Sequence, residues 1–202
     1  YPVDQVSAVT EWRGGLVVAG LFDRLGDQQA ANVAFFDGTQ WRTLGGGDLN
    51  GEVRALQVVG DRLYAGGAFE RAGGVLVRGL ANWDGRQWSG VGDWAEQAPS
   101  GDGVHGLAAY QGDLVVVGQF AHAGATPASN VACWDGTAWR ALGSGVNGKV
   151  LAVVARDNEL WLGGEFTTAG GRISYHVAQW HDSIVPVSLA AFVAERSGRA
   201  AR

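Results

Sequence analysis

Two columns of aromatic residues recur along the chain with the same spacing. The first column holds phenylalanines that each stand before a Gly-containing turn: Phe22, Phe69, Phe120 and Phe166. The second column lies in apolar segments further along: Phe36, Trp83, Trp134 and Trp180. Both columns have spacings of 47, 51 and 46 residues. Two landmarks with identical spacings predict four tandem units, and repeats of this length are typical of propeller blades and other arrays.

Each unit contains signals for four short strands, as the second unit illustrates. Residues 53–56 and 63–67 are apolar segments separated by a polar Gly-Asp-Arg turn. After a glycine-rich excursion, a third apolar segment ends at Trp83 and is followed by Asp84-Gly85, a strong hairpin signal. A fourth strand begins at Trp88. We find no sustained helical period, so the pattern predicts an all-β chain of four-stranded antiparallel units.

Four-stranded units of this length predict an all-β fold, a β-propeller built from four blades. The expected propeller covers residues 1–186, with blades at about 1–52, 53–103, 104–149 and 150–186. Four blades either close a small ring or form part of a larger propeller. The sequence contains no methionine, so we expect it to be part of a longer chain.

The fuller pattern of the repeat resembles a known family. It reads Gly-Gly-x-Phe-x-x-Ala-Gly-Gly, then Ala-x-Trp-Asp-Gly-x-x-Trp-x-x-Leu-Gly-x-Gly, over about residues 6–182. This pattern resembles the kelch-like β-propeller repeat of secreted bacterial surface proteins. It is also similar to the extracellular repeats of fungal cortical polarity markers. The resemblance implies a propeller on the cell surface or outside the cell, beside other domains of the same polypeptide, whereas function does not follow from such a fold.

The fourth unit departs from the pattern. Trp180 is followed by His181-Asp182 in place of Asp-Gly, and the tryptophan of the fourth strand is missing. The segment 184–194 resembles the opening strand of an immunoglobulin-like domain, which would then occupy the tail 187–202. Alternatively, the segment closes the fourth blade at its outer edge, where proline is tolerated.

Composition excludes several classes of function. The net charge is −5 with no basic cluster, which argues against nucleic-acid binding. No apolar run is long enough to insert into a membrane. Cys133 is the single cysteine, which rules out an internal disulfide framework, and we expect an inert, buried thiol. Motifs for a nucleophile elbow, a zinc protease or a phosphate loop are absent, so we expect no catalytic residues.

The best local candidate for a binding site is the long exit from the second unit. Trp88 to Val104 spans 16 residues, against 12 and 11 in the neighbouring units. In this insertion Trp94 is a candidate for stacking on a sugar ring, while Asp93 and Glu96 accept hydrogen bonds from its hydroxyls. The alternative is that Trp94 folds back as a hydrophobic plug beneath its own loop.

Other candidates are weaker. Arg54 and His105 lie on first strands, which line the channel of a propeller, and they either bind a polar ligand or form a hydrated lining. Asp48 and Asn50 offer oxygens for a calcium ion, but an ordinary Asx-turn is the favoured interpretation, so no cofactor is expected. The recurring aspartates of the Asp-Gly pairs are interpreted as turn formers: Asp37, Asp84 and Asp135.

The sequence therefore predicts a non-catalytic extracellular binding or adhesion module whose ligand is a glycan or a protein. One alternative is a carbohydrate-active enzyme, a hydrolase or lyase, that uses acids such as Asp93, Glu96 or Asp102. The other alternative is a structural spacer in a multidomain surface protein.

Overall fold

The computed structural model describes residues 5–45, 49–94, 103–180 and 186–188. Within these ranges the regular structure is β-sheet, arranged as four sheets of four antiparallel strands and four two-stranded ribbons. This confirms the prediction of an all-β chain made of four-stranded antiparallel sheets. The sheets are numbered 1 to 4 in chain order below.

Each sheet is a meander in which successive long strands lie side by side. Sheet 1 consists of β1 (Gln5–Trp12), β2 (Gly15–Leu21), β5 (Val33–Phe36) and β6 (Trp41–Arg42). Sheet 2 consists of β7 (Glu52–Val59), β8 (Arg62–Ala68), β11 (Leu80–Trp83) and β12 (Trp88–Gly90). Sheet 3 consists of β13 (Gly103–Tyr110), β14 (Asp113–Gln119), β17 (Val131–Trp134) and β18 (Trp139–Ala141).

Sheet 4 has the same order despite its divergent sequence. It consists of β19 (Val150–Arg156), β20 (Glu159–Gly164), β23 (Val177–Trp180) and β24 (Pro186–Ser188). Strand β24 pairs with β23, so that Ser188 lies opposite Ala178. Residues 186–188 thus form the fourth strand of sheet 4. This is the arrangement that we considered as the alternative to the first strand of an immunoglobulin-like domain. Residues 189–202 lie outside the described residues.

The glycine-rich excursions between the second and third strands form the two-stranded ribbons. Their strands are β3 (Arg24–Leu25) with β4 (Gln28–Gln29), β9 (Arg71–Ala72) with β10 (Val75–Leu76), β15 (His122–Ala123) with β16 (Thr126–Pro127), and β21 (Thr168–Ala169) with β22 (Arg172–Ile173). Asn32 ends the first excursion with φ of 66°. Its Oδ1 accepts a bond from the amide of Phe22 at 3.0 Å, and its Nδ2 donates to the Leu49 oxygen at 2.6 Å. Asn130 makes the same two kinds of bond in sheet 3, so an asparagine ties the ribbon to the following exit segment.

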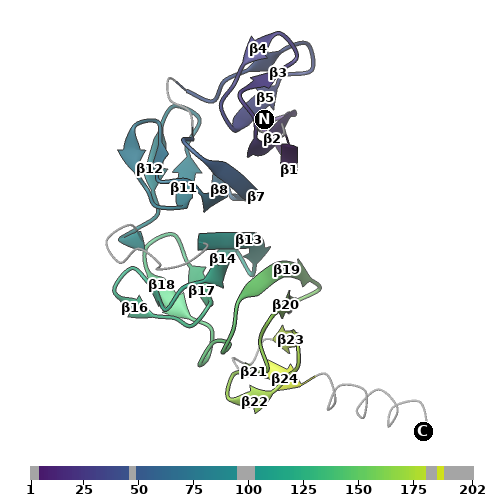
Figure 1. Cartoon of the computed structure of the whole chain (residues 1–202), viewed down its shortest axis with the longest axis vertical. Helices are drawn as coiled ribbons and strands as arrows, with labels where there is room; N and C mark the ends of the chain where they lie inside the picture. The colour runs from purple at the N-terminus through teal and green to yellow at the C-terminus, as the bar shows by residue number, and fades with distance from the viewer. Residues whose placement is uncertain (1–4, 46–48, 95–102, 181–185, 189–202) are drawn as a thin grey trace, which may run out of the picture.

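The four sheets follow one another along an open arc (Figure 1). Their first strands lie on the inner side, where β1 contacts β7, β7 contacts β13 and β13 contacts β19. Strands β1 and β19 lie at the two ends of the arc and are separated by a gap (Figure 1). The ends of the arc therefore do not pack on each other as neighbouring sheets do.

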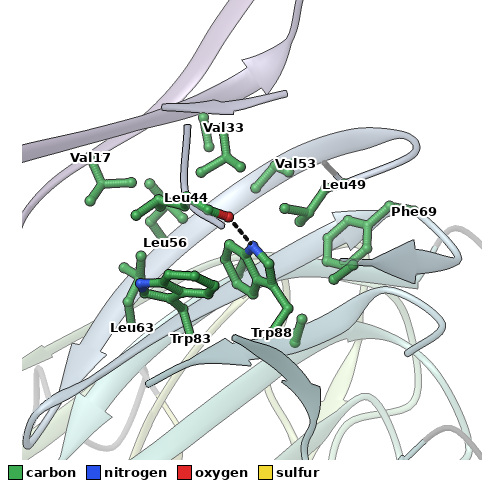
Figure 2. Close-up of a cluster of buried hydrophobic side chains, with 14 of the residues drawn as sticks. Val17, Val33, Leu44, Leu49, Val53, Leu56, Leu63, Phe69, Trp83 and Trp88 are labelled. Carbon is green, nitrogen blue, oxygen red and sulfur yellow. Dashed lines mark hydrogen bonds between the residues drawn. The ribbon is translucent and has the colours of Figure 1, made fainter. Parts of the chain in front are cut away.

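Apolar side chains fill the space between neighbouring sheets. Between sheets 1 and 2, Trp83 and Trp88 lie beneath a layer of aliphatic side chains from both sheets (Figure 2). Gly45 leaves sheet 1 with φ of +80°, and a Cβ there would come within 2.6 Å of the Trp83 ring. The glycine-rich exit of one sheet and the tryptophan of the next sheet are therefore coupled. The tryptophan ring occupies the space that a side chain at the glycine would need.

Candidate functional site

The predicted site at the exit of sheet 2 is packed against sheet 3. The Trp94 side chain is only 1% exposed, and its Nε1 donates to the Arg78 oxygen at 3.0 Å. Its ring lies 5.1 Å from that of Phe120 and 5.2 Å from that of Trp139, measured between centroids. A ring buried on all sides offers no face on which a sugar can stack, so this placement corrects the expectation of an exposed platform. Trp94 is instead a buried hydrophobic plug that packs on Phe120 and Trp139 of sheet 3, while the loop beneath which the alternative placed it, residues 95–102, lies outside the described residues.

The carboxylates proposed beside Trp94 do not form a site in the described residues. Asp93 Oδ2 accepts a hydrogen bond from the amide of Ala125, at 2.8 Å, in the ribbon of sheet 3. This bond fastens the exit of sheet 2 to the next sheet. Glu96 and Asp102 lie outside the described residues.

Arg54 and His105 lie on the first strands β7 and β13, as predicted, and both are half-buried. The Nε of Arg54 forms an ion pair with Glu52 Oε2 at 2.8 Å, so its charge is balanced on its own strand. Trp94, by contrast, follows the fourth strand of sheet 2. Arg54 and His105 thus belong to the inner strands of the arc, and Trp94 to a different part of the fold.

Of the two proposed calcium ligands, only Asn50 lies in the described residues. Asp48 lies outside them, and Asn50 Oδ1 accepts bonds from the amides of Glu70 and Arg71, at 2.9 and 2.7 Å. Asn50 therefore orders the start of a ribbon, which is the role of an Asx-type turn. In the described ranges, no group of three histidine, cysteine or acidic side chains is placed to hold a metal ion.

A pocket of about 490 Å³ opens between sheets 2 and 3. It lies where the hairpin turns of the two sheets meet, and Val91 and Gly92 of the sheet 2 exit complete it. The side chains that give it chemical character are polar or aromatic: Asp61, Arg62, Tyr64, Asn82, Trp134 and Asp135.

Substitutions within the repeat open this pocket. Val59 ends its strand at the register position held by Trp12 in sheet 1 and Tyr110 in sheet 3. Trp12 Nε1 donates to the Asp61 oxygen in the turn of the next sheet, and the Tyr110 hydroxyl bonds the Asn158 oxygen in the same way. Valine is too short to reach across. The space that a large aromatic ring fills in the other two interfaces therefore stays open between sheets 2 and 3.

A second substitution makes the pocket polar. Asn82 occupies the position of Phe35 in sheet 1 and Cys133 in sheet 3, which both pack in apolar clusters. Arg62 Nη1 donates to Asn82 Oδ1 at 2.6 Å, and Asn82 Nδ2 donates to the Gly90 oxygen at 2.8 Å. The amide is thereby fixed in one orientation and holds the guanidinium of Arg62 at the pocket wall.

Tyr64 and Asp135 add a donor and an acceptor. Burial raises the pKa of the Tyr64 hydroxyl, so this group stays protonated and able to donate. The pKa of Asp135 is lowered to about 2, first by the hydroxyl of Thr137 and then by the amides of Ala138 and Thr137. Asp135 is therefore a carboxylate at neutral pH that accepts hydrogen bonds but cannot deliver a proton.

The pocket thus combines a guanidinium, a phenol and carboxylates with the half-buried ring of Trp134. Concave sites with a few fixed polar groups and an aromatic wall suit a small polyhydroxylated ligand. The insertion in the second unit did not indicate this pocket, because the pocket results from one shortened and one polar side chain, Val59 and Asn82. Two signals were available in the sequence: valine at position 59, where sheets 1 and 3 have Trp12 and Tyr110, and asparagine at position 82, where they have Phe35 and Cys133.

Comparison with known proteins places the chain in no family: no family model matches it, and no curated protein is significantly similar to it. Among the residues that the structure describes, we find no helix with the length and apolar character needed to cross a membrane. The function must therefore be argued from the geometry of the pocket.

Proposed function

We propose that this protein is a non-catalytic binding module of the kelch-like β-propeller type and that it holds a saccharide in the pocket between sheets 2 and 3. The strongest support is the polar pocket of about 490 Å³ between sheets 2 and 3. At this interface Val59 stands where the other two interfaces have a large aromatic residue. Hydroxyl groups both donate and accept hydrogen bonds, so a ligand rich in them matches a wall that contains Arg62, Tyr64 and Asp135.

The propeller assignment rests on the order of strands and on the packing of the sheets. Meandering four-stranded sheets that contact each other through their first strands along an arc are the arrangement expected of blades. The proposed location, secreted or at the cell surface, rests on the resemblance of the repeat. A binding module on a propeller scaffold needs only one modified interface, which is what sheets 2 and 3 provide.

The state of the carboxylates in the described residues supports binding without catalysis. Glycoside hydrolysis requires one acid with a raised pKa to protonate the leaving oxygen. The hydrogen bonds to Asp135 act in the opposite direction and hold its pKa near 2. The carboxylate of Asp93, proposed for the enzymatic alternative, is engaged by the amide of Ala125.

The test is a glycan-array screen of the protein followed by titration calorimetry with the best saccharide. Val59→Trp places in sheet 2 the residue that fills the equivalent space in sheet 1, so it should abolish binding while leaving the unfolding temperature unchanged or higher. Arg62→Ala removes a donor from the wall and should weaken binding about tenfold or more. Arg86→Ala, at the exposed tip of the β11–β12 hairpin, is the matched control and should bind normally.

Two results would contradict the proposal. Saccharide binding that survives Val59→Trp would move the ligand away from this pocket. An array with no binding to any saccharide would reject a glycan ligand and leave a protein ligand or a spacer role.

A further inference from the structure

Sheets 1 and 3 each carry an arginine directly after the tryptophan of the fourth strand, and a carboxylate of the same sheet neutralises it. The two arginines are Arg42 and Arg140. Arg42 Nη2 forms an ion pair with Asp37 Oδ2 at 2.7 Å. Arg140 Nη2 pairs with Asp113, and its Nε lies 3.8 Å from Asp135 Oδ2. The charge of this arginine is therefore balanced inside each of the two sheets.

Sheet 2 lacks this arginine and carries another at a different position. Ser89 follows Trp88 in its fourth strand. The cation of sheet 2 is Arg62, at the start of the second strand, where sheet 1 has Gly15 and sheet 3 has Asp113. Arg62 also lines the pocket between sheets 2 and 3. The repeat therefore places its cation on the pocket wall in this sheet.

The guanidinium of Arg62 is held by a neutral group. Its Nη1 donates to Asn82 Oδ1 at 2.6 Å, and it forms no ion pair with any carboxylate of the described residues. A guanidinium has five N–H groups in a planar fork, so most of them remain available to a ligand. Because Asn82 carries no charge, it orients the guanidinium without neutralising it.

The carboxylates that line the pocket are engaged elsewhere or lie apart from the guanidinium. Asp135 Oδ1 accepts bonds from the amides of Thr137 and Ala138, and its Oδ2 faces Arg140. Asp61 precedes Arg62 in the β7–β8 turn, but no ion pair joins these two side chains. In the described residues, the pocket therefore presents a guanidinium without a carboxylate partner, while the charge of Asp135 is balanced by an arginine of its own sheet.

We propose that the saccharide held in this pocket is acidic and that its carboxylate or sulfate group binds to Arg62. This inference rests on the proposed function, because it names the class of ligand for the same pocket. Carboxylate and sulfate both present two oxygens that match the fork of a guanidinium with two parallel hydrogen bonds. The hydroxyl of Tyr64 and the carboxylate of Asp135 then bond to hydroxyl groups of the sugar ring.

The test compares acidic saccharides with their neutral counterparts. The probes are oligosaccharides of galacturonic, glucuronic and mannuronic acid, each beside its carboxyl-reduced form, and sulfated oligosaccharides, each beside its desulfated form. In titration calorimetry at low salt, the acidic member of the best pair should bind about tenfold more tightly or better. Sodium chloride should reduce this difference, because salt screens the attraction between the charges. The two sets of pairs distinguish a carboxylate from a sulfate.

Variants of Arg62 test whether this residue causes the preference. Arg62→Gln removes the charge, so the acidic and neutral members of a pair should bind with similar affinity. Arg62→Lys keeps the charge but not the planar fork, so it should retain only part of the preference. Arg42→Gln is the matched control, because it removes an arginine that is already paired with Asp37, and it should leave the preference unchanged.

The outcomes separate this inference from the proposed function. Equal affinity for the acidic and neutral members, abolished for both by Val59→Trp, would overturn the acidic preference and keep the saccharide site. Binding to neither member of any pair would reject the proposed function, and this inference with it. A preference that survives Arg62→Gln would place the acidic group away from Arg62 and would also overturn the inference.

Discussion

Trp88 of sheet 2 donates its indole hydrogen to the backbone oxygen of Leu44, which lies in the segment that leaves sheet 1 (Figure 2). The Nε1–O distance is 3.0 Å, and both residues are buried. Trp139 of sheet 3 repeats the relationship with the oxygen of Val91, in the segment that leaves sheet 2. A tryptophan in the fourth strand therefore satisfies a carbonyl of the preceding sheet, which joins neighbouring sheets by a polar contact within an apolar layer.

Replacing Trp88 by phenylalanine should separate the hydrogen bond from the apolar contact. Trp88→Phe leaves the buried oxygen of Leu44 without this donor, so we expect the free energy of unfolding to fall by about 1–3 kcal/mol. Trp83 is the matched control, because its ring is equally buried at 4% exposure. Its Nε1 has no hydrogen-bond partner among the described residues. Urea denaturation should show a clearly smaller loss for Trp83→Phe, and equal losses in the two variants would contradict the role of the bond.

Truncation within the second aromatic column should cost more where the ring is more deeply buried. Trp83→Ala removes a buried ring between sheets 1 and 2 and should cost about 3–5 kcal/mol of unfolding free energy. Phe36→Ala removes the equivalent ring of sheet 1, which is only half-buried, and should cost about 1–2 kcal/mol. Denaturant titration measures both. A loss below about 1 kcal/mol for Trp83→Ala would be incompatible with its place in the core.

Acid should weaken the turn that contains Asp135. The folded pKa of this carboxyl is about 2, below its ordinary value of about 3.9. The stabilisation is therefore complete above pH of about 4 and is lost as the pH falls through about 2. Asp135→Asn cannot change its charge, so its unfolding temperature should fall less than that of the wild type across this range. Thr137→Val, which removes the strongest of the hydrogen bonds, should move the wild-type transition to higher pH. Identical pH profiles for all three proteins would contradict this assignment.

Cys133 should react with thiol reagents only after unfolding. The side chain is 5% exposed, and burial raises the pKa of its thiol to about 11, so little reactive thiolate forms at neutral pH. Mass spectrometry after iodoacetamide treatment should find the native chain unmodified and the denatured chain fully alkylated. Rapid modification of the native chain at neutral pH would show that the interface between sheets 3 and 4 opens.

Several elements of the fold were predictable because their signals are local. Asp-Gly turns illustrate this: Asp37 Oδ1 accepts bonds from the amides of Thr39 and Gln40, and Asp84 Oδ1 does the same for Arg86 and Gln87. The prediction that these aspartates form turns is confirmed. Such bonds span two or three residues, so the sequence of the turn specifies them without reference to the rest of the chain.

The candidate site was less predictable because its residues come from different sheets. Trp94 follows strand β12 in the sequence, yet its ring is buried by Phe120 and Trp139 of sheet 3. Asn82 is a polar residue at a strand position that is apolar in sheets 1 and 3. It contributes to the pocket only because Arg62 bonds to it and the turns of sheet 3 complete the wall.

By itself, the sequence determined the four repeated units, their strands and their turns, because periodicity and turn chemistry act over a few residues. Only the tertiary structure decided which rings are buried and where two sheets leave a polar pocket. Those features depend on the side chains that meet across an interface, and residues about 50 positions apart come into contact only when the sheets pack.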